Sequence, residues 1–246
     1  MTIFQQQLMS RKVLIVKNIT HEGPGLLETL LCEHGIAWHS EDLSAGGTVP
    51  DPRGYSALVV LGGPQSANDE SPAMLLQLRR IEQALHEEIP SLGICLGIQC
   101  LVKAGGGKVV NSPVKEIGFL DPEGNPFRID LTPAGKKEAL FGGLGKSFPV
   151  FQLHGETVEL ASSGMELLAT GKQCPVQAVR VGKNAYGLQC HFELTTAMFS
   201  DWCDTDSDLK RMNRQELMEQ YETIREEYHS TGLKLMHNFL RISELV

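Results

Sequence analysis

Residues 89–97, IPSLGICLG, hold a short apolar run that ends in the pattern Gly93-Ile94-Cys95-Leu96-Gly97. A helical pattern follows over 95–103, so the stretch predicts a strand, a sharp turn and a helix. The two glycines allow the backbone to turn tightly and to present the Cys95 thiol at the tip of the turn. At a helix N-terminus, backbone N–H groups and the helix dipole favour the thiolate. Cys95 is therefore a candidate nucleophile.

The alternation of strand and helix patterns continues on the N-terminal side of this turn. Strand signals lie at 13–16 (VLIV) and 57–61 (ALVVL), and each is followed by apolar residues at helical spacing, over 26–31 and 72–85. This order predicts an α/β fold with a flavodoxin-like, open, mostly parallel sheet and helices on both faces. Ligands of such sheets bind beyond the carboxyl ends of the strands, where the turns after Leu61 and Ile94 both fall.

The second half of the chain has a different pattern. Short β-like runs lie at 114–120, 127–131, 148–153, 176–181 and 185–190, and helical patterns follow at 209–228 and 233–241. We expect a tail over 1–11, the α/β domain over 12–197, and a helical C-terminal extension of the same domain over 198–246. The extension is expected to cover the sheet, with docking of a partner as the alternative, because its apolar residues need burial: Leu233, Leu235, Met236, Phe239 and Leu240.

Composition and charge exclude several classes of function. The 246 residues carry a formal net charge of −8, which argues against nucleic acid as a partner because such binding relies on basic surfaces. No run approaches the roughly 18 apolar residues of a membrane span, and the N-terminus does not have the pattern of a signal peptide. We therefore expect a cytoplasmic protein without a membrane partner. No spacing of His, Cys or carboxylate residues indicates a metal, and no cofactor is expected.

A nucleophilic cysteine needs a base, and the base needs a group that orients it. His191-Phe192-Glu193 closes a strand pattern, so His191 and Glu193 lie on the same face of an extended segment. Glu193 can then accept a hydrogen bond from one ring nitrogen while the other nitrogen faces a thiol. Taken alone, the segment is also compatible with a strand end whose polar residues are solvated.

Two further segments are candidates for binding a substrate. The pair Gly62 and Gly63 is compatible with a simple tight turn, but it also allows a backbone N–H to point at an oxyanion, together with the N–H of Leu96. Gln99 follows Cys95 by one helical turn and therefore shares its face. A solvated glutamine is the alternative for Gln99.

Together these segments resemble the class I (triad) glutamine amidotransferases over about residues 12–197, and within that family the amidotransferase domain of GMP synthase. Residues 62–66 (GGPQS), 93–99 (GICLGIQ) and 187–193 (GLQCHFE) are similar to the oxyanion-strand, nucleophile-elbow and His-x-Glu motifs. Residues 150–158 (VFQLHGETV) are similar to the loop that holds the α-amino and α-carboxylate groups of glutamine. Four motifs in this order are far more specific than any one of them.

The resemblance implies a Cys-His-Glu triad in which Cys95 is the nucleophile, His191 the general base and acid, and Glu193 the group that orients His191. The N–H groups of Gly63 and Leu96 would form the oxyanion hole. The thiolate would attack the carboxamide carbon of L-glutamine, His191 would protonate the departing ammonia, and water would hydrolyse the γ-glutamyl thioester. The residues implied to bind the substrate are Gly62, Gln99, Leu153, His154, Gly155 and Glu156.

Two departures from the family pattern keep alternatives open. Phe192 stands where proline is usual, and Leu153 and Glu156 replace the ends of the usual Ser-His-Gly-Asp. Nothing after residue 197 resembles an acceptor domain, so a glutaminase would pass ammonia to a separate synthetase chain. The second alternative is a stand-alone hydrolase of γ-glutamyl peptides or conjugates with the same triad. The third is a non-catalytic binding or regulatory module.

Overall fold

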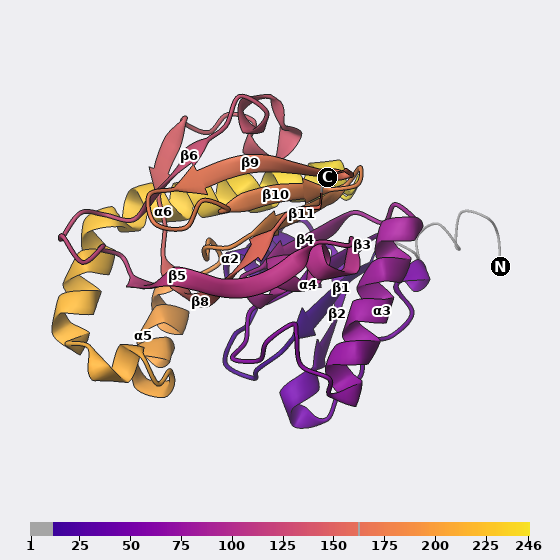
Figure 1. The fold of residues 1–246 in the computed structure, drawn as a ribbon, viewed down its shortest axis with the longest axis horizontal. Helices are drawn as coiled ribbons and strands as arrows, with labels where there is room; N and C mark the ends of the chain where they lie inside the picture. The colour runs from indigo at the N-terminus through magenta and orange to yellow at the C-terminus, as the bar shows by residue number, and fades with distance from the viewer. Residues whose placement is uncertain (1–11, 162) are drawn as a thin grey trace.

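The computed structural model describes residues 12–161 and 163–246, and the tail expected at 1–11 lies outside them. In the described residues a nine-stranded sheet has the order β2-β1-β3-β4-β11-β10-β9-β6-β7 (Figure 1). One half is parallel and consists of β2 (Ala37–Asp42), β1 (Lys12–Lys17), β3 (Ala57–Val60), β4 (Ser91–Ile94) and β11 (Ala185–Leu188). The other half is antiparallel and consists of β10 (Ala178–Val181), β9 (Met165–Gly171), β6 (Arg128–Leu131) and β7 (Ser147–Pro149).

Helices cover both faces of the sheet, as the sequence predicts. Alternate residues of β1 point to opposite faces, so Val13 and Ile15 join a different buried cluster from Leu14 and Val16. The first cluster includes α2 (Leu26–Glu33) and α6 (Arg214–Ile242), and the second includes α3 (Pro72–His86) and α4 (Leu96–Ala104). The expected α/β fold is therefore confirmed. No helix in residues 12–161 and 163–246 is long and apolar enough to cross a membrane.

A second, two-stranded sheet pairs β5 (Lys108–Gly118) with β8 (Gln152–Glu159) in antiparallel register. The register shifts between Asn111 and Glu116, and Glu116 then lies opposite His154. A third buried cluster contains Phe119 and Phe151 together with residues of α5 (Thr196–Thr205) and α6. Short 3₁₀ helices occupy connecting segments, at Leu43–Ala45, Pro52–Gly54, Gly135–Lys137, Ala139–Phe141 and Leu209–Arg211.

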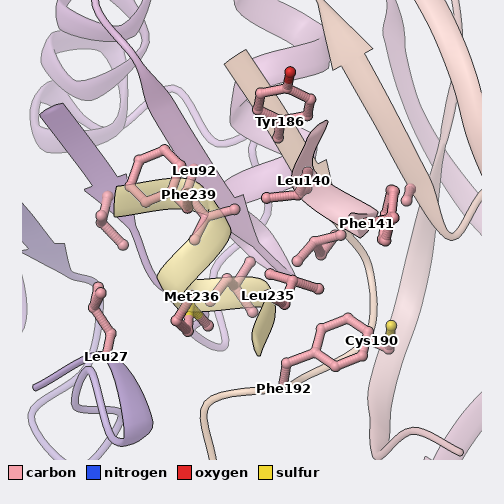
Figure 2. Packing of buried hydrophobic residues seen from close by; sticks show 14 of the residues in the cluster. Leu27, Leu92, Leu140, Phe141, Tyr186, Cys190, Phe192, Leu235, Met236 and Phe239 are labelled. Atoms are coloured by element: carbon pink, nitrogen blue, oxygen red, sulfur yellow. The ribbon is translucent and has the colours of Figure 1, made fainter. Parts of the chain in front are cut away.

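The C-terminal region corrects one expectation. The patterns at 209–228 and 233–241 predict two helices, but α6 runs without interruption from Arg214 to Ile242. Gly232 remains inside the helix because α6 packs closely there: a Cβ on Gly232 would lie 2.3 Å from the carbonyl oxygen of Phe192. The expected burial is confirmed, since the side chains of Leu235, Met236 and Phe239 pack toward Leu92 and Phe192 (Figure 2).

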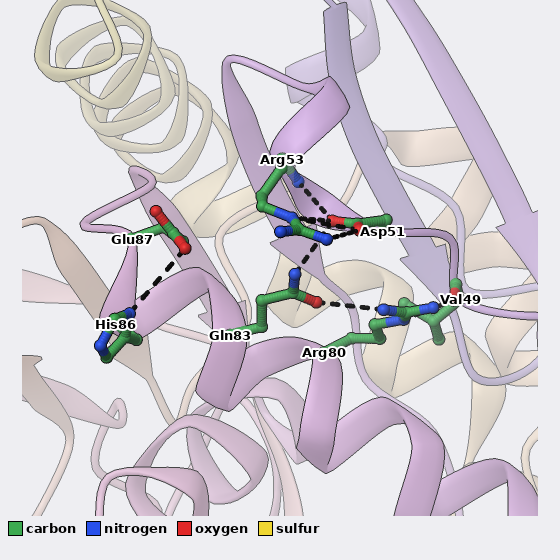
Figure 3. A network of polar contacts seen from close by, with 7 residues as sticks. All are labelled: Val49, Asp51, Arg53, Arg80, Gln83, His86 and Glu87. Atoms are coloured by element: carbon green, nitrogen blue, oxygen red, sulfur yellow. Dashed lines mark hydrogen bonds and ion pairs between the residues drawn. The ribbon is translucent and has the colours of Figure 1, made fainter.

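On the face of the sheet opposite to α6, a polar network fixes α3 to the loop that precedes β3 (Figure 3). Asp51 caps the 3₁₀ helix Pro52–Gly54 by accepting from the N–H of Arg53 at 3.0 Å. The same carboxylate accepts from Gln83 of α3 at 3.1 Å, and Arg80 donates to the carbonyl of Val49 at 3.4 Å. These contacts hold the long connection between β2 and β3 against the helix.

Candidate active site

Cys95 occupies the sharp turn between β4 and α4. Its backbone has a positive φ of 54°, which residues other than glycine rarely adopt. Both flanking glycines are required by close packing. A Cβ on Gly97 would lie 2.1 Å from the carbonyl oxygen of Val60, and a Cβ on Gly93 would lie 2.4 Å from the backbone of Gly97. The N–H of Cys95 donates to the carbonyl of Leu188 at 2.8 Å, which ties the turn to β11. The turn has the geometry of a nucleophile elbow.

The Cys95 thiol faces His191, which follows β11 in the neighbouring position of the sheet. Both residues line the same cavity, where the sulfur of Cys95 acts on the imidazole and raises its pKa. Cys95 Sγ also lies 3.6 Å from the carbonyl oxygen of Leu153. Cys95 is 7% exposed and lines a cavity of about 550 Å³. The thiol is therefore largely buried but borders the cavity.

Glu193 holds the other side of the His191 ring. Its Oε1 lies 2.6 Å from His191 Nδ1, and its Oε2 accepts from the N–H of Phe192 at 2.8 Å. Both side chains are about 1% exposed. Because Nδ1 is engaged by the carboxylate, the second ring nitrogen is left for the sulfur.

The backbone around His191 is also fixed. Its N–H donates to the carbonyl of Phe151 at 2.9 Å, and the hydroxyl of Tyr228 in α6 donates to its carbonyl at 3.0 Å. The indole ring of Trp202 in α5 meets the imidazole edge-on, with 5.0 Å between ring centroids. Residues of the helical C-terminal region thus hold the imidazole in place.

Charge near His191 determines its protonation. Burial alone lowers the pKa of an imidazole, but the carboxylate of Glu193 and the sulfur of Cys95 outweigh this and raise the pKa of His191 well above its usual value. The charged form of the ring is thus favoured by the two groups that lie on either side of it.

The glycine pair after β3 lies on the other side of the imidazole. Gly63 and Leu96 line the cavity together with Cys95. Gly62 lies against His191 and Glu22, because a Cβ built on it would be 3.1 Å from His191 Cε1 and 2.2 Å from Glu22 Oε2. The turn is tied to the loop after β1, where Asn18 donates to the carbonyl of Leu61 at 2.9 Å.

The segment 153–156 forms the opposite wall of the cavity, but it is part of strand β8 and not a loop. Pairing with β5 explains the difference. Gln99 Nε2 donates to the carbonyl of Glu156 at 3.4 Å, and Ser66 donates to the Glu156 carboxylate at 2.9 Å. The predicted substrate-binding residues Gln99, Leu153, His154, Gly155 and Glu156 thus line one wall together.

Sequence reasoning missed the remaining wall of the cavity. It contains His21 and Glu22 from the loop after β1, Lys115 from β5, and residues 205–208 after α5. Glu22 follows a buried strand at the same sheet edge as Cys95, and this position is the signal that identifies it. Burial is the largest factor in raising the pKa of Glu22 to about 7. Its Oε2 atom is buried without a hydrogen-bond partner.

Within the described ranges, one group of residues has the residue types and the spacing of metal ligands. Ligand atoms of Glu116, His154 and Cys174 lie within 4.8 Å of one another, and all three residues are buried. Each already has a protein partner: His154 Nε2 contacts Glu116 Oε2 at 2.8 Å, and Cys174 Sγ contacts Thr157 Oγ1 at 3.1 Å. These contacts explain the cluster as a hydrogen-bonded network that supports the wall formed by β8.

Comparison with protein families matches residues 17–200 to the family described as glutamine amidotransferase class-I. The chain is similar to the glutamine amidotransferase-like protein YfeJ of Salmonella typhimurium, with 35% identity over 59% of this chain and 60% of that protein. It is similar to the glutamine-hydrolyzing GMP synthase of Thermosipho melanesiensis, with 33% identity over 58% of this chain. The chain spans only 25% of that synthase.

Solved structures show the same architecture. A glutamine amidotransferase from Thermotoga maritima superposes with a TM-score of 0.82 and 28% identity, over 95% of this chain and 98% of that one. A glutamine amidotransferase from Methylobacillus flagellatus gives a TM-score of 0.79 over 95% of each chain, and its 24% identity supports the fold alone.

Proposed function

This chain belongs to the class I glutamine amidotransferase family, and from that premise we propose that it hydrolyses L-glutamine through a γ-glutamyl thioester on Cys95. The observation that carries the proposal is that Cys95 and His191 line one cavity, where the sulfur acts on the imidazole, while His191 Nδ1 lies 2.6 Å from Glu193 Oε1. This arrangement supports Cys95 as the nucleophile, His191 as the base and Glu193 as the group that orients the base.

The reaction has two stages. The Cys95 thiolate attacks the γ-carboxamide carbon, and the C–N bond breaks as His191 gives its proton to the nitrogen, which leaves as ammonia. The now neutral His191 takes a proton from water, which attacks the thioester and releases glutamate and the thiolate. Glu193 stays ionised and stabilises the imidazolium at each stage.

The walls of the cavity fit the other needs of this reaction. The N–H groups of Gly63 and Leu96 would stabilise the oxyanion, because both residues lie beside Cys95 at the sheet edge. Gln99 and the strand segment 153–156 would hold the α-amino and α-carboxylate groups. Gly62 would contribute indirectly, by leaving room for the imidazole.

Labelling with a glutamine-mimicking diazoketone tests the proposal. A single adduct on Cys95, located by peptide mapping and blocked by excess glutamine, is expected together with ammonia release from glutamine. Cys100 is the matched control in the same helix, since burial raises the pKa of its thiol to about 12. Wild-type ammonia release by Cys95→Ala would overturn the proposal.

We further propose that the ammonia is used by a separate synthetase chain, and that residues 198–246 belong to the same domain as 12–197. The relatives named GMP synthase support a synthetase as the acceptor of the ammonia. Contacts of Tyr228 and Trp202 with His191 support the single domain.

The cavity favours one alternative function. Its volume of about 550 Å³ is in the range of sites for ligands larger than an amino acid. Hydrolysis of γ-glutamyl peptides or conjugates by the same triad would use this extra space for the leaving group. Turnover of a γ-glutamyl dipeptide much faster than glutamine would favour this alternative, and no turnover would exclude it.

A further inference from the structure

Glu22 is an acidic residue of the cavity wall that the proposed mechanism leaves without a role. It lies in the loop between β1 and α2, is only 8% exposed, and lines the cavity that contains Cys95. Its Oε2 atom is buried and has no hydrogen-bond partner. A buried carboxylate oxygen without a donor is costly, and the side chain that carries this one lines the cavity.

The carboxyl group lies on the His191 side of the cavity. Glu22 Oε2 and His191 Cε1 both border the space that a Cβ on Gly62 would fill, at 2.2 Å and 3.1 Å from it. His191, Glu193 and Asp206 are the charged groups that act on Glu22 most strongly. Asp206 does not lack donors, because its Oδ1 accepts from the N–H groups of Asp208 and Leu209 at 2.8 and 2.9 Å.

The proposed function already assigns protein groups to the carbonyl oxygen and to the α-amino and α-carboxylate groups of a γ-glutamyl substrate. In the proposed function, the carbonyl oxygen points at Gly63 and Leu96, and the α-amino and α-carboxylate groups point at Gln99 and segment 153–156. The remaining substituent of the reacting carbon is the leaving nitrogen, which must face His191 to be protonated. Beyond His191, the wall of the cavity continues with Glu22.

We propose that Glu22 contacts the leaving nitrogen of the substrate and makes the site selective for γ-glutamyl amides over γ-glutamyl esters. This inference rests on the proposed function. An amide nitrogen carries N–H groups that the free oxygen of Glu22 can accept, whereas an ester oxygen has none. Glu22 gives and takes no proton: the S–C bond forms, the C–N bond breaks, His191 supplies the proton, and the ammonia leaves past the carboxylate.

The test compares two substrates, L-glutamine and L-glutamate γ-methyl ester, in wild type, Glu22→Gln and Asp206→Asn. The measured quantity is the ratio of kcat/KM for the amide to kcat/KM for the ester. At about pH 8, above its raised pKa of about 7, Glu22 is ionised. Glu22→Gln is expected to lower the ratio about tenfold, because a neutral amide oxygen is a weaker acceptor than a carboxylate oxygen. Asp206→Asn removes a neighbouring negative charge from a side chain whose Oδ1 already accepts two backbone N–H groups, so its ratio is expected to stay within about twofold of wild type.

A second variant covers the case in which Glu22→Gln does not fold, as judged by a missing cooperative thermal transition. Glu22→Asp keeps the charge but withdraws the oxygen by one methylene group, and the ratio is expected to fall in this variant too. Equal losses on amide and ester would overturn the inference, because Glu22 would then act only through His191. An unchanged ratio, or an equal fall in Asp206→Asn, would overturn it as well. In these cases wild-type activity preserves the proposed function, whereas a wild type that hydrolyses neither substrate overturns both.

Discussion

The Nε2 atom of His154 lies 2.8 Å from Oε2 of Glu116, and both side chains are almost completely buried. The other ring nitrogen of His154 contacts the carbonyl of Glu156 at 2.9 Å. This second imidazole–carboxylate pair therefore fixes the shape of segment 153–156 from behind, in the way that Glu193 fixes His191.

Replacing Glu116 is expected to weaken substrate binding more than chemistry. Glu116→Gln removes a buried, charge-assisted contact, so the wall at 153–156 loses its fixed geometry and KM for glutamine rises about tenfold. The value of kcat is expected to change little, because Cys95 and His191 lie outside this pair. Steady-state ammonia release measures both constants. A fall in kcat at unchanged KM would contradict the role assigned to Glu116.

Gly62 is expected to tolerate no side chain. In Gly62→Ala the new Cβ must displace Glu22 Oε2, 2.2 Å away, and it crowds His191 Cε1 at 3.1 Å. A displacement of the base by about 1 Å is expected to lower kcat about 100-fold. Gly23→Ala is the matched control, because a Cβ there meets nothing within 4 Å. Equal activity of the two variants would show that the imidazole does not need this space.

Glu193→Gln is expected to lower kcat by about 10² to 10⁴-fold, because the neutral amide neither orients His191 in the same way nor stabilises its positive charge. The substitution keeps the size of the side chain, so the fold is expected to persist, as circular dichroism can verify. Tyr228→Phe serves for comparison: it removes the hydrogen bonds of the hydroxyl with the His191 carbonyl and the Leu194 N–H, and it costs about 1 to 2 kcal/mol of unfolding free energy. Loss of activity in Tyr228→Phe as large as in Glu193→Gln would argue that backbone position, and not charge, limits the reaction.

The protein is expected to lose stability as pH rises through neutrality. Between the usual carboxyl pKa of 4.5 and the raised value of about 7, folded Glu22 holds a proton that the unfolded chain has released. At about 1.4 kcal/mol per pKa unit this contributes about 3 kcal/mol, which is lost as pH rises through the window. His191 acts in the same direction, because its pKa is raised in the folded state.

Thermal unfolding of wild type and Glu22→Gln at about pH 5 and about pH 8 measures this effect. The groups that face Glu22 are His191, Glu193 and Asp206, so Asp206→Asn is the control for general charge. Glu22→Gln is expected to lose less stability than wild type between the two pH values. The same pH dependence in Glu22→Gln and wild type would assign the effect to other groups.

Local patterns were sufficient for strands β1, β3, β4 and β11 of the parallel half of the sheet, and for the positions of Cys95, His191 and Glu193 at its edge. Strand β2, AWHSED, escaped prediction because it is an edge strand without the apolar alternation that marks a buried one. The continuity of α6 was also hidden, because Gly232 has the sequence signature of a helix end. Only the close approach of the Phe192 carbonyl explains a glycine inside that helix.

The acidic residues Glu116 and Glu22 could not be predicted from the sequence, for a different reason. Glu116 meets His154 only because β5 and β8 pair with a shifted register, and no local pattern reports such pairing. Glu22 meets His191 across the sheet edge, between segments far apart in the sequence. Motifs therefore predict the groups that react, whereas the groups that tune them depend on tertiary packing.

The hydrogen bonds of Tyr228 with His191 and Leu194 also bear on the order of events during synthesis of the chain. A ribosome makes Cys95, His191 and Glu193 before it makes any residue of α6. During synthesis, then, the thiol leaves the exit tunnel before the helix that steadies its base exists. The nascent chain holds all three chemical groups while it still lacks the support that aligns them, so we expect any reactivity of the thiol to begin only after α6 has docked.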